Sequence, residues 1–155
     1  MTVHRAEVDE SVFTEHDDRW ILGLRGLAVT KISVDHQLSL LLGTDSRVVL
    51  EAPCRLSHGS AGGKVLYDML VPERQEVAPA LALFGVKVVS AVAFKTGSLR
   101  LVFENGLHLD CQADSSFEAW QLTGLGGWRF VSLPGGELAV WSGAEGRGEG
   151  GGGCW

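Results

Sequence analysis

The sequence has few cysteines and no excess of positive charge. Its three cysteines are Cys54, Cys111 and Cys154, an odd number without close pairing along the chain, so we expect free thiols in a reducing compartment. The chain carries 13 lysines and arginines against 19 aspartates and glutamates, which gives a formal net charge of −6. This balance argues against nucleic acids and anionic membranes as partners and suits a basic partner protein.

Long apolar segments are also missing. No apolar run reaches the roughly 20 residues that a membrane-spanning helix needs. The chain starts with polar and acidic residues and shows no apolar stretch typical of a secretory signal. We therefore expect a cytoplasmic protein that does not enter a membrane. The 155 residues are enough to fold as one domain around one core.

Motifs for catalysis and cofactor binding are absent as well. The sequence contains no G-x-S-x-G nucleophile elbow. Its glycine-rich segment 59–63 differs from a phosphate-binding loop, because His58 stands where that loop has glycine and Val65 where it has serine or threonine. We therefore predict no catalytic residue and no bound cofactor.

Two Cys/His pairs are the candidates for a zinc site: Cys54 with His58, and His108 with Cys111. In an extended strand, His108 and Cys111 point to opposite faces and cannot bind one ion together. The sequence therefore favours buried cysteines and a solvent-facing His108 over a metal site.

What the sequence does contain is apolar alternation. Between residues 99 and 111 the apolar residues of one face are Leu99, Leu101, Phe103, Leu107, Leu109 and Cys111. This period of two predicts antiparallel strands with one face in a core and one face in water. Asn105 and Gly106 stand between the two runs and predict a two-residue type I′ turn, in which both residues have positive φ.

The segment that starts at residue 83 has a counterpart earlier in the chain. Residues 24–29 (Leu-Arg-Gly-Leu-Ala-Val) match residues 83–88 (Leu-Phe-Gly-Val-Lys-Val), and each is followed by strand, turn, strand, turn and strand. We predict two duplicated three-stranded meanders whose apolar faces cover each other. The alternative is that two unrelated meanders share the same alternation.

The remaining segments complete a mainly β fold. Residues 77–84 predict one short helix, with Pro79 in its first turn and Gly85 as its C-cap. Three further strands are expected between residues 117 and 141. The predicted fold is an antiparallel sandwich or a partly open barrel.

Composition divides the chain into three parts. We predict a flexible acidic arm over residues 1–18, a single β-rich domain over residues 19–141, and a disordered glycine-rich tail over residues 142–155.

Acidic and aromatic side chains near the end of the domain are candidates for an interaction surface: Glu118, Trp120, Glu137 and Trp141. Trp20 and Trp128 join Trp120 and Trp141 as candidates for an aromatic ligand platform. The alternatives are that the glutamates face solvent and that the tryptophans pack in the core or at its rim.

The same segments carry a resemblance. Glu118-Ala119-Trp120 and the run P-G-G-E-L-A-V-W at residues 134–141, with the two L-x-G-x-x-V units, resemble a small actinobacterial family of unknown function. The resemblance covers about residues 20–141. It implies a small β-rich fold in a bacterial cytoplasm and implies no activity.

Two classes of function remain open. We predict a non-catalytic protein-interaction module, such as an immunity or accessory factor in a bacterial system. The alternative is a scaffold or carrier protein whose glycine-rich tail presents Cys154 and Trp155 to a modifying or ligating enzyme. An enzyme or small-ligand binder that uses the tryptophans and His108 is a third option.

Overall fold

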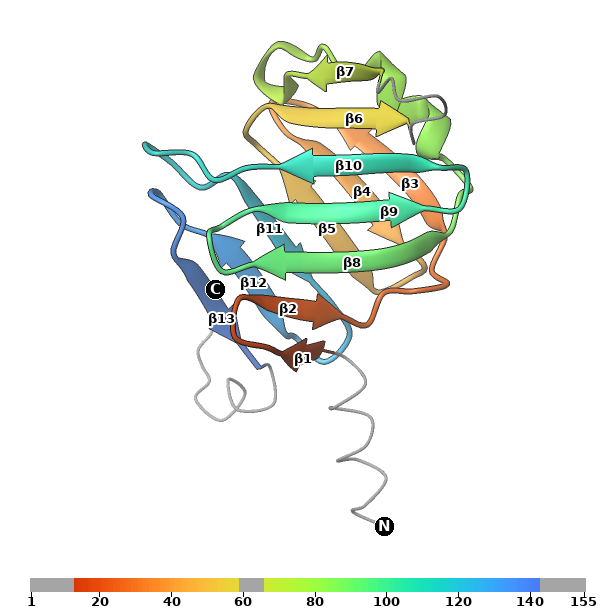
Figure 1. Cartoon of the computed structure of the whole chain (residues 1–155). Helices are drawn as coiled ribbons and strands as arrows, with labels where there is room; N and C mark the ends of the chain where they lie inside the picture. Colours follow the sequence, from red (N-terminus) through yellow and green to blue (C-terminus); the bar gives the residue numbers. More distant parts are fainter. Residues whose placement is uncertain (1–12, 59–65, 143–155) are drawn as a thin grey trace.

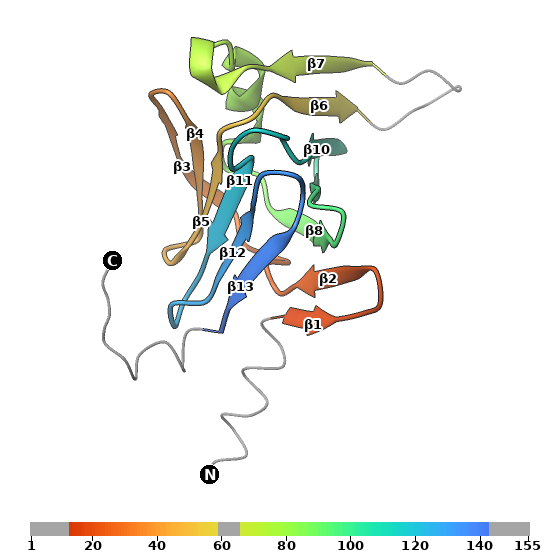
Figure 2. The same ribbon diagram turned by 90° about the vertical axis from the view of Figure 1, so that its left-hand side faces the viewer.

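The computed structural model describes residues 13–58 and 66–142, which form a sandwich of two antiparallel sheets (Figures 1 and 2). The front sheet, nearer the viewer in Figure 1, contains in spatial order β1 (Phe13–Glu15), β2 (Arg19–Leu22), β8 (Val88–Phe94), β9 (Leu99–Phe103), β10 (Leu107–Cys111), β6 (Cys54–His58) and β7 (Tyr67–Leu70). The rear sheet contains in spatial order β13 (Leu138–Trp141), β12 (Arg129–Ser132), β11 (Trp120–Thr123), β5 (Ser46–Leu50), β4 (Leu38–Leu42) and β3 (Val29–Val34). The prediction of an antiparallel sandwich is confirmed, and within the described residues the sheets do not close into a barrel.

The two meanders pair in the same way. Strand β3 pairs Val29 with Leu42 and then Lys31 with Leu41, and β8 pairs Val88 with Phe103 and then Ser90 with Val102, so each first strand carries a bulge at its second residue. Between the meanders, Ala28 and Lys87 form an isolated antiparallel bridge. The Gly26 N–H donates to the Val88 carbonyl and the Gly85 N–H to the Val29 carbonyl, both at 2.8 Å. The two units are therefore structurally equivalent around this bridge.

The first meander, β3–β5, lies in the rear sheet and the second, β8–β10, in the front sheet. The strand that follows each meander in the chain belongs to the opposite sheet. Strand β6 follows β5 in the chain but pairs with β10, and β11 follows β10 but pairs with β5. Strands β7 and β12 then extend the two sheets beside β6 and β11. Neither sheet is complete without a strand from the other unit.

The core lies between the sheets, where the alternation predicts it. The inward residues of β4, β9 and β10 are all buried: Leu38, Leu40, Leu42, Leu99, Leu101, Phe103, Leu107, Leu109 and Cys111. Polar neighbours such as Arg100 and Asp110 face outward. The predicted face assignment of these strands is confirmed.

The predicted helix is present but is a 3₁₀-helix. Element η2 (Ala78–Leu83) has Pro79 in its first turn, and a shorter 3₁₀-helix, η1 (Pro72–Arg74), precedes it. The Phe84 N–H donates to the Leu81 carbonyl at 3.2 Å, which is the i to i+3 bond of this helix type. Six residues with a proline at the second position give few α-helical bonds, and the chain turns away at Gly85, where φ is +81°.

Part of the predicted N-terminal arm belongs to the sheet. Strand β1 lies within residues 1–18, the range expected to be flexible, and it pairs with β2. The ring of Phe13 lies 5.5 Å from the rings of both Trp20 and Phe130 in edge-on geometry. This aromatic contact anchors β1.

The predicted type I′ turn is wrong. The loop between β9 and β10 has three residues, and only Gly106 of the three has positive φ, at +89°. The Gly106 N–H donates to the Phe103 carbonyl at 3.0 Å, while the Asn105 side chain accepts the Leu107 N–H at 3.2 Å. Because the asparagine side chain bonds its own loop, a three-residue connection with glycine last replaces the two-residue turn.

Residues 1–12, 59–65 and 143–155 lie outside the described part. The start of the predicted arm, the glycine-rich segment after His58 and the tail candidates Cys154 and Trp155 therefore stay predictions. Among the described residues, no helix has the length and apolar character needed to span a membrane.

Candidate functional site

A row of side chains crosses the outer face of the front sheet. Cross-strand pairing aligns one residue from each of six neighbouring strands in this row. From β2 to β7 they are Ile21, Val92, Arg100, Asp110, Arg55 and Met69. The row is apolar at both ends and charged in its middle. It faces away from the core because the alternate residues of the same strands are buried.

The centre of the row is a carboxylate between two guanidinium groups. The Arg100 Nε donates to the Asp110 Oδ1 at 2.8 Å. Arg55 is the cross-strand neighbour of Asp110 on the other side, and its guanidinium lies 5.2 Å from the centre of the Tyr67 ring. A half-exposed ion pair of this kind adds at most about 1 kcal/mol to stability.

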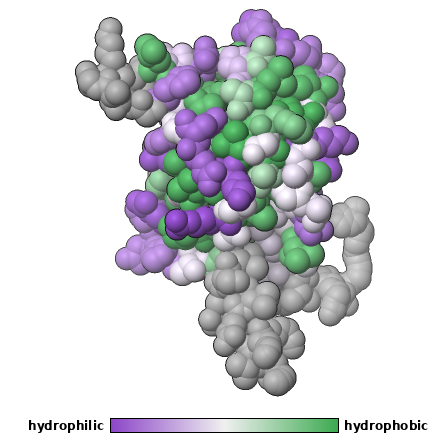
Figure 3. Space-filling model, turned by 90° about the vertical axis from the view of Figure 1, so that its right-hand side faces the viewer, coloured by the Kyte–Doolittle hydropathy of each residue, from purple (hydrophilic) through white to green (hydrophobic). Residues whose placement is uncertain are grey.

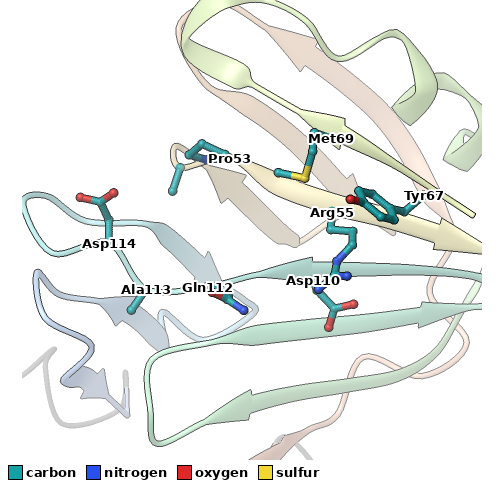
Figure 4. A pocket seen from close by; sticks show the side chains of 9 residues that line it. Pro53, Arg55, Tyr67, Met69, Asp110, Gln112, Ala113 and Asp114 are labelled. Carbon is teal, nitrogen blue, oxygen red and sulfur yellow. The ribbon is translucent and has the colours of Figure 1, made fainter. Parts of the chain in front are cut away.

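A hollow of about 430 Å³ opens beside this row (Figure 4). Its lining comes from β6, β7, β10 and the segments next to them: Ala52, Pro53, Arg55, Tyr67, Met69, Asp110, Gln112, Ala113 and Asp114. The lining offers an aromatic ring, a thioether, a guanidinium, an amide and two carboxylates. These groups can contact and hydrogen-bond a ligand.

The lining lacks the arrangement needed for nucleophilic catalysis. None of these described lining residues is Ser, Thr, Cys or His. The Asp114 carboxylate accepts the N–H groups of Ser116 at 2.8 Å and Phe117 at 3.2 Å, so it holds its own loop.

Strand β7 forms the outer edge of the hollow and of the front sheet. The His58 N–H donates to the Leu66 carbonyl at 3.0 Å, which marks a hydrogen-bonded pair between β6 and this segment. Because such pairs alternate in an antiparallel ladder, the backbone groups of Tyr67 and Met69 point away from β6. The side chains of Tyr67 and Met69 are 54% and 50% exposed. The edge thus presents backbone hydrogen-bonding groups and two large side chains together.

Other apolar surface gathers at one end of the sandwich. Figure 3 shows this end, which carries η2, with green residues over much of its upper half. Leu81 and Phe84, in η2 and directly after it, are 63% and 61% exposed. The hollow combines such side chains with charged groups and an amide, so this surface ranks below it as a candidate site.

The structure separates the four residues predicted as an interaction surface. Trp120 is fully buried, and its Nε1 donates to the Gly97 carbonyl at 2.8 Å, so a partner cannot reach it. Glu118 is half-buried before β11, and Glu137 is exposed before β13 at the same end of the rear sheet. Trp141 is 47% exposed at the other end of β13, beside the guanidinium of Arg129 at 5.6 Å. These four residues form no common surface.

The tryptophans do not form a platform. Trp120 and Trp128 are buried, and Trp20 is half-buried against Phe13 and Phe130. Packing at the core and its rim, the alternative considered for the tryptophans, describes these three. Only Trp141 is exposed among the tryptophans of the described residues.

The two described cysteines lie opposite each other. Cys54 on β6 pairs with Cys111 on β10, although they are far apart in the sequence, and both thiols are free and buried. A hydrogen bond with Cys111, followed by burial, raises the pKa of the Cys54 thiol well above its ordinary value. His108 lies on the outer face of β10, away from Cys111. The described residues contain no group of three potential metal ligands.

Sequence reasoning missed the hollow because it predicted no strand over residues 54–58 or 67–70. Cys54 and Leu56 alternate with Arg55 and Ser57, which is a weak strand signal in a short segment. A strand was expected after the second meander, where β11 lies. If the two meanders are equivalent, a strand should also follow the first meander, and this is where β6 lies.

Comparison with models of known protein families matches residues 20–142 to a family of unknown function (DUF6188). The comparisons with curated proteins and with solved structures give no match. The matched range contains the complete lining of the hollow and both cysteines on its strands.

Proposed function

Since this chain belongs to DUF6188, a family of unknown function, its role is inferred from its own surface, and we propose that it is a non-catalytic protein-interaction module. Its binding surface in this proposal is β7 together with the hollow beside it. The bound element is an extended segment of a partner protein, which adds to the front sheet as a further strand next to β7.

The observation that carries the proposal is the open edge at Tyr67 and Met69. Their outward backbone groups can pair with an extended segment, and their exposed side chains can pack against its alternate residues. Aromatic and methionine side chains are enriched in the contact surfaces of protein complexes. The hollow then receives a side chain of the added strand.

Charge favours a basic segment. The carboxylate of Asp110 is already paired with Arg100 and that of Asp114 accepts backbone N–H groups, so the preference for a basic segment rests on the net charge of −6 of the whole chain. The overall charge would speed the encounter with a basic partner. An immunity or accessory factor that binds a basic protein is the biological role that we propose.

The test starts with a displayed library of random linear peptides selected against the purified full chain. We expect the selected peptides to alternate apolar residues with Lys or Arg. The variant Met69→Pro removes the outward N–H that an added strand needs, without removing a bond to β6. Its affinity for a selected peptide, measured by titration calorimetry, should fall tenfold or more relative to the variant Met69→Ala.

Two controls make this result specific. Met69→Ala keeps the backbone N–H, and Val34→Ala changes a side chain of similar exposure, 46%, on the edge strand of the rear sheet. Val34→Ala should bind like the unchanged protein. A selection without a common pattern, or equal affinities for Met69→Pro and Met69→Ala, would show that strand addition at β7 is not the function.

The equivalence of the meanders also supports a proposal about origin and setting. We propose that the domain arose by internal duplication, since the two units share their bulges and the exchange of the following strand.

We also propose an actinobacterial cytoplasm as its location, which the resemblance implies and which suits the free thiols of Cys54 and Cys111. Fractionation of the native host and detection of the protein would test this location.

A further inference from the structure

The backbone geometry around Cys54 and Cys111 suits a covalent link. The hydrogen bond from His58 to Leu66 fixes the ladder so that residues 54, 56 and 58 direct their backbone groups to β7, not to β10. Cys54 and Cys111 are therefore a non-hydrogen-bonded pair of the β6–β10 ladder. The Cα atoms of such pairs lie about 4.5 Å apart, within the range of roughly 4.4–6.8 Å that a disulfide spans.

Both thiols face the core and contact each other. Their exposed fractions are 1% for Cys54 and 0% for Cys111. The Cys54 thiol lies 3.2 Å from the Ala52 carbonyl, and the Cys111 thiol lies 3.8 Å from the Ala119 carbonyl, so each can donate to a backbone oxygen. The raised pKa of Cys54, due first to its hydrogen bond with Cys111, keeps that thiol protonated at neutral pH. The resting state is a reduced, buried dithiol.

The equivalent position in the other unit shows that the fold does not require thiols here. The last residue of the first meander, Leu50, pairs with the first residue of the exchanged strand, Trp120. In the second meander the corresponding pair is Cys111 with Cys54. Leu50 and Trp120 are both fully buried. An apolar pair fills this place in one unit, whereas the other unit has two groups that can react with each other.

The thiol pair lies beneath the floor of the hollow. Pro53 and Arg55 flank Cys54, and Asp110 and Gln112 flank Cys111. All four flanking residues line the hollow. A bond between the two sulfur atoms would fix β6 to β10 and would shift the residues on both sides of it.

We propose that Cys54 and Cys111 are a redox modification site, a dithiol that hydrogen peroxide converts to a cross-strand disulfide and that thereby changes the hollow. The change in the hollow deepens the proposed function as a means of regulating it. The cross-link itself is independent of what the hollow binds.

The reaction balances with peroxide as the oxidant. At mildly alkaline pH one thiol gives up its proton to the solvent and its thiolate attacks a peroxide oxygen; an S–O bond forms, the O–O bond breaks, and the leaving hydroxide takes a proton to become water. The sulfur of the second cysteine then attacks the sulfenic sulfur, the S–S bond forms and a second water leaves. One peroxide is reduced to two waters, and the protein loses two hydrogen atoms. A thiol reductant restores the dithiol.

The experiment uses the full chain with Cys154→Ser, which removes the third thiol. The folded protein is treated with hydrogen peroxide at mildly alkaline pH, and its intact mass and peptide map are measured. We expect the loss of two hydrogen atoms, a peptide that links Cys54 to Cys111, and reversal by dithiothreitol. A further Cys54→Ala change should abolish the mass loss. An unchanged mass, oxygen addition without a link, or a link that forms only in denaturant would overturn the proposal.

A second measurement tests the effect on the hollow without any ligand. Amide resonances of the reduced and oxidised forms are compared by two-dimensional NMR. Resonances of Arg55, Asp110 and Gln112 should shift, while those of the rear edge strand, such as Val34, should not. A cross-link that leaves the hollow residues unshifted would overturn the regulatory part. Failure of peptide binding to β7 would instead count against the proposed function and would leave the dithiol result intact.

Discussion

At the scale of single residues, Gly97 connects the turn between β8 and β9 to the core. Its carbonyl accepts hydrogen bonds from the Trp120 Nε1 and the Ser132 Oγ, both at 2.8 Å. Its φ is +103°, and a Cβ there would lie 2.6 Å from the Gly136 backbone. Two constraints, conformation and space, therefore require glycine at this position.

We predict that Gly97→Ala lowers the free energy of unfolding by about 3 kcal/mol or more, since backbone strain and a backbone clash add. Gly106→Ala is the matched control, because its φ is +89° and no atom lies within 4 Å of the added Cβ. It should cost only about 1–2 kcal/mol. Urea unfolding measures both values, and equal losses would contradict the proposed clash.

The raised pKa of Cys54 predicts a pH dependence of stability. The unfolded thiol loses its proton near pH 8.5, about the ordinary value, whereas the folded thiol keeps its proton to higher pH. The contribution of the buried, protonated Cys54 thiol to the free energy of unfolding is therefore fully present below about pH 8.5. It is lost as the pH rises through the pKa of this thiol in the folded protein. Under reducing conditions, the stability difference between the unchanged protein and Cys54→Ala should shrink above this pH. A constant difference would contradict the raised pKa.

At the scale of elements, β1 tests how far local composition predicts structure. The acidic residues around it suggested a flexible arm, but the contacts of Phe13 with Trp20 and Phe130 join distant parts of the chain. No sequence window contains both β1 and β12. The same limit applies to the hollow, whose lining joins β6 and β7 to β10, about 40 residues later in the chain.

We predict that Phe13→Ala lowers the free energy of unfolding by about 2 kcal/mol, because it removes a half-buried ring from an aromatic cluster. The neighbouring change Thr14→Ala, at an exposed position, should stay within about 0.5 kcal/mol. Urea unfolding compares the two. Equal, small effects would show that β1 is not anchored by its aromatic residue.

Alternation predicted the faces of β4, β9 and β10 because the pattern of period two is local and strong there. It did not predict β6, in which the polar Ser57 is buried, or β7, in which the large side chains of Tyr67 and Met69 are exposed. The turn at Asn105 also differed, because a side-chain hydrogen bond, and not backbone preference alone, decided its type.

At the scale of the whole molecule, the exchange of β6 and β11 joins the two units into one folding unit. Each sheet takes a strand from the other unit, so unfolding one unit removes a strand from both sheets. We predict one cooperative transition. Far-ultraviolet circular dichroism and tryptophan fluorescence should give the same urea midpoint. Two separated midpoints would show that the units unfold independently.

The general architecture was predictable because the duplicated pattern and the alternation agree on two sheets facing each other. The binding surface was less predictable. Glu118, Trp120, Glu137 and Trp141 share sequence motifs, yet the core requires Trp120, and Trp141 lies at the opposite end of the rear sheet from Glu118 and Glu137. A short sequence motif can therefore reflect packing in the core as well as a binding site.

Amide hydrogen exchange of the full chain, with and without a selected basic peptide, would show whether a partner strand adds at β7. The amides of Tyr67 and Met69 point outward at the open edge of the front sheet, so we expect rapid exchange in the protein alone and clear protection with peptide. The amides of β13, at the edge of the rear sheet, serve as the internal control and should not change. Protection at β13 with none at Tyr67 and Met69, or no protection at saturating peptide, would contradict the account.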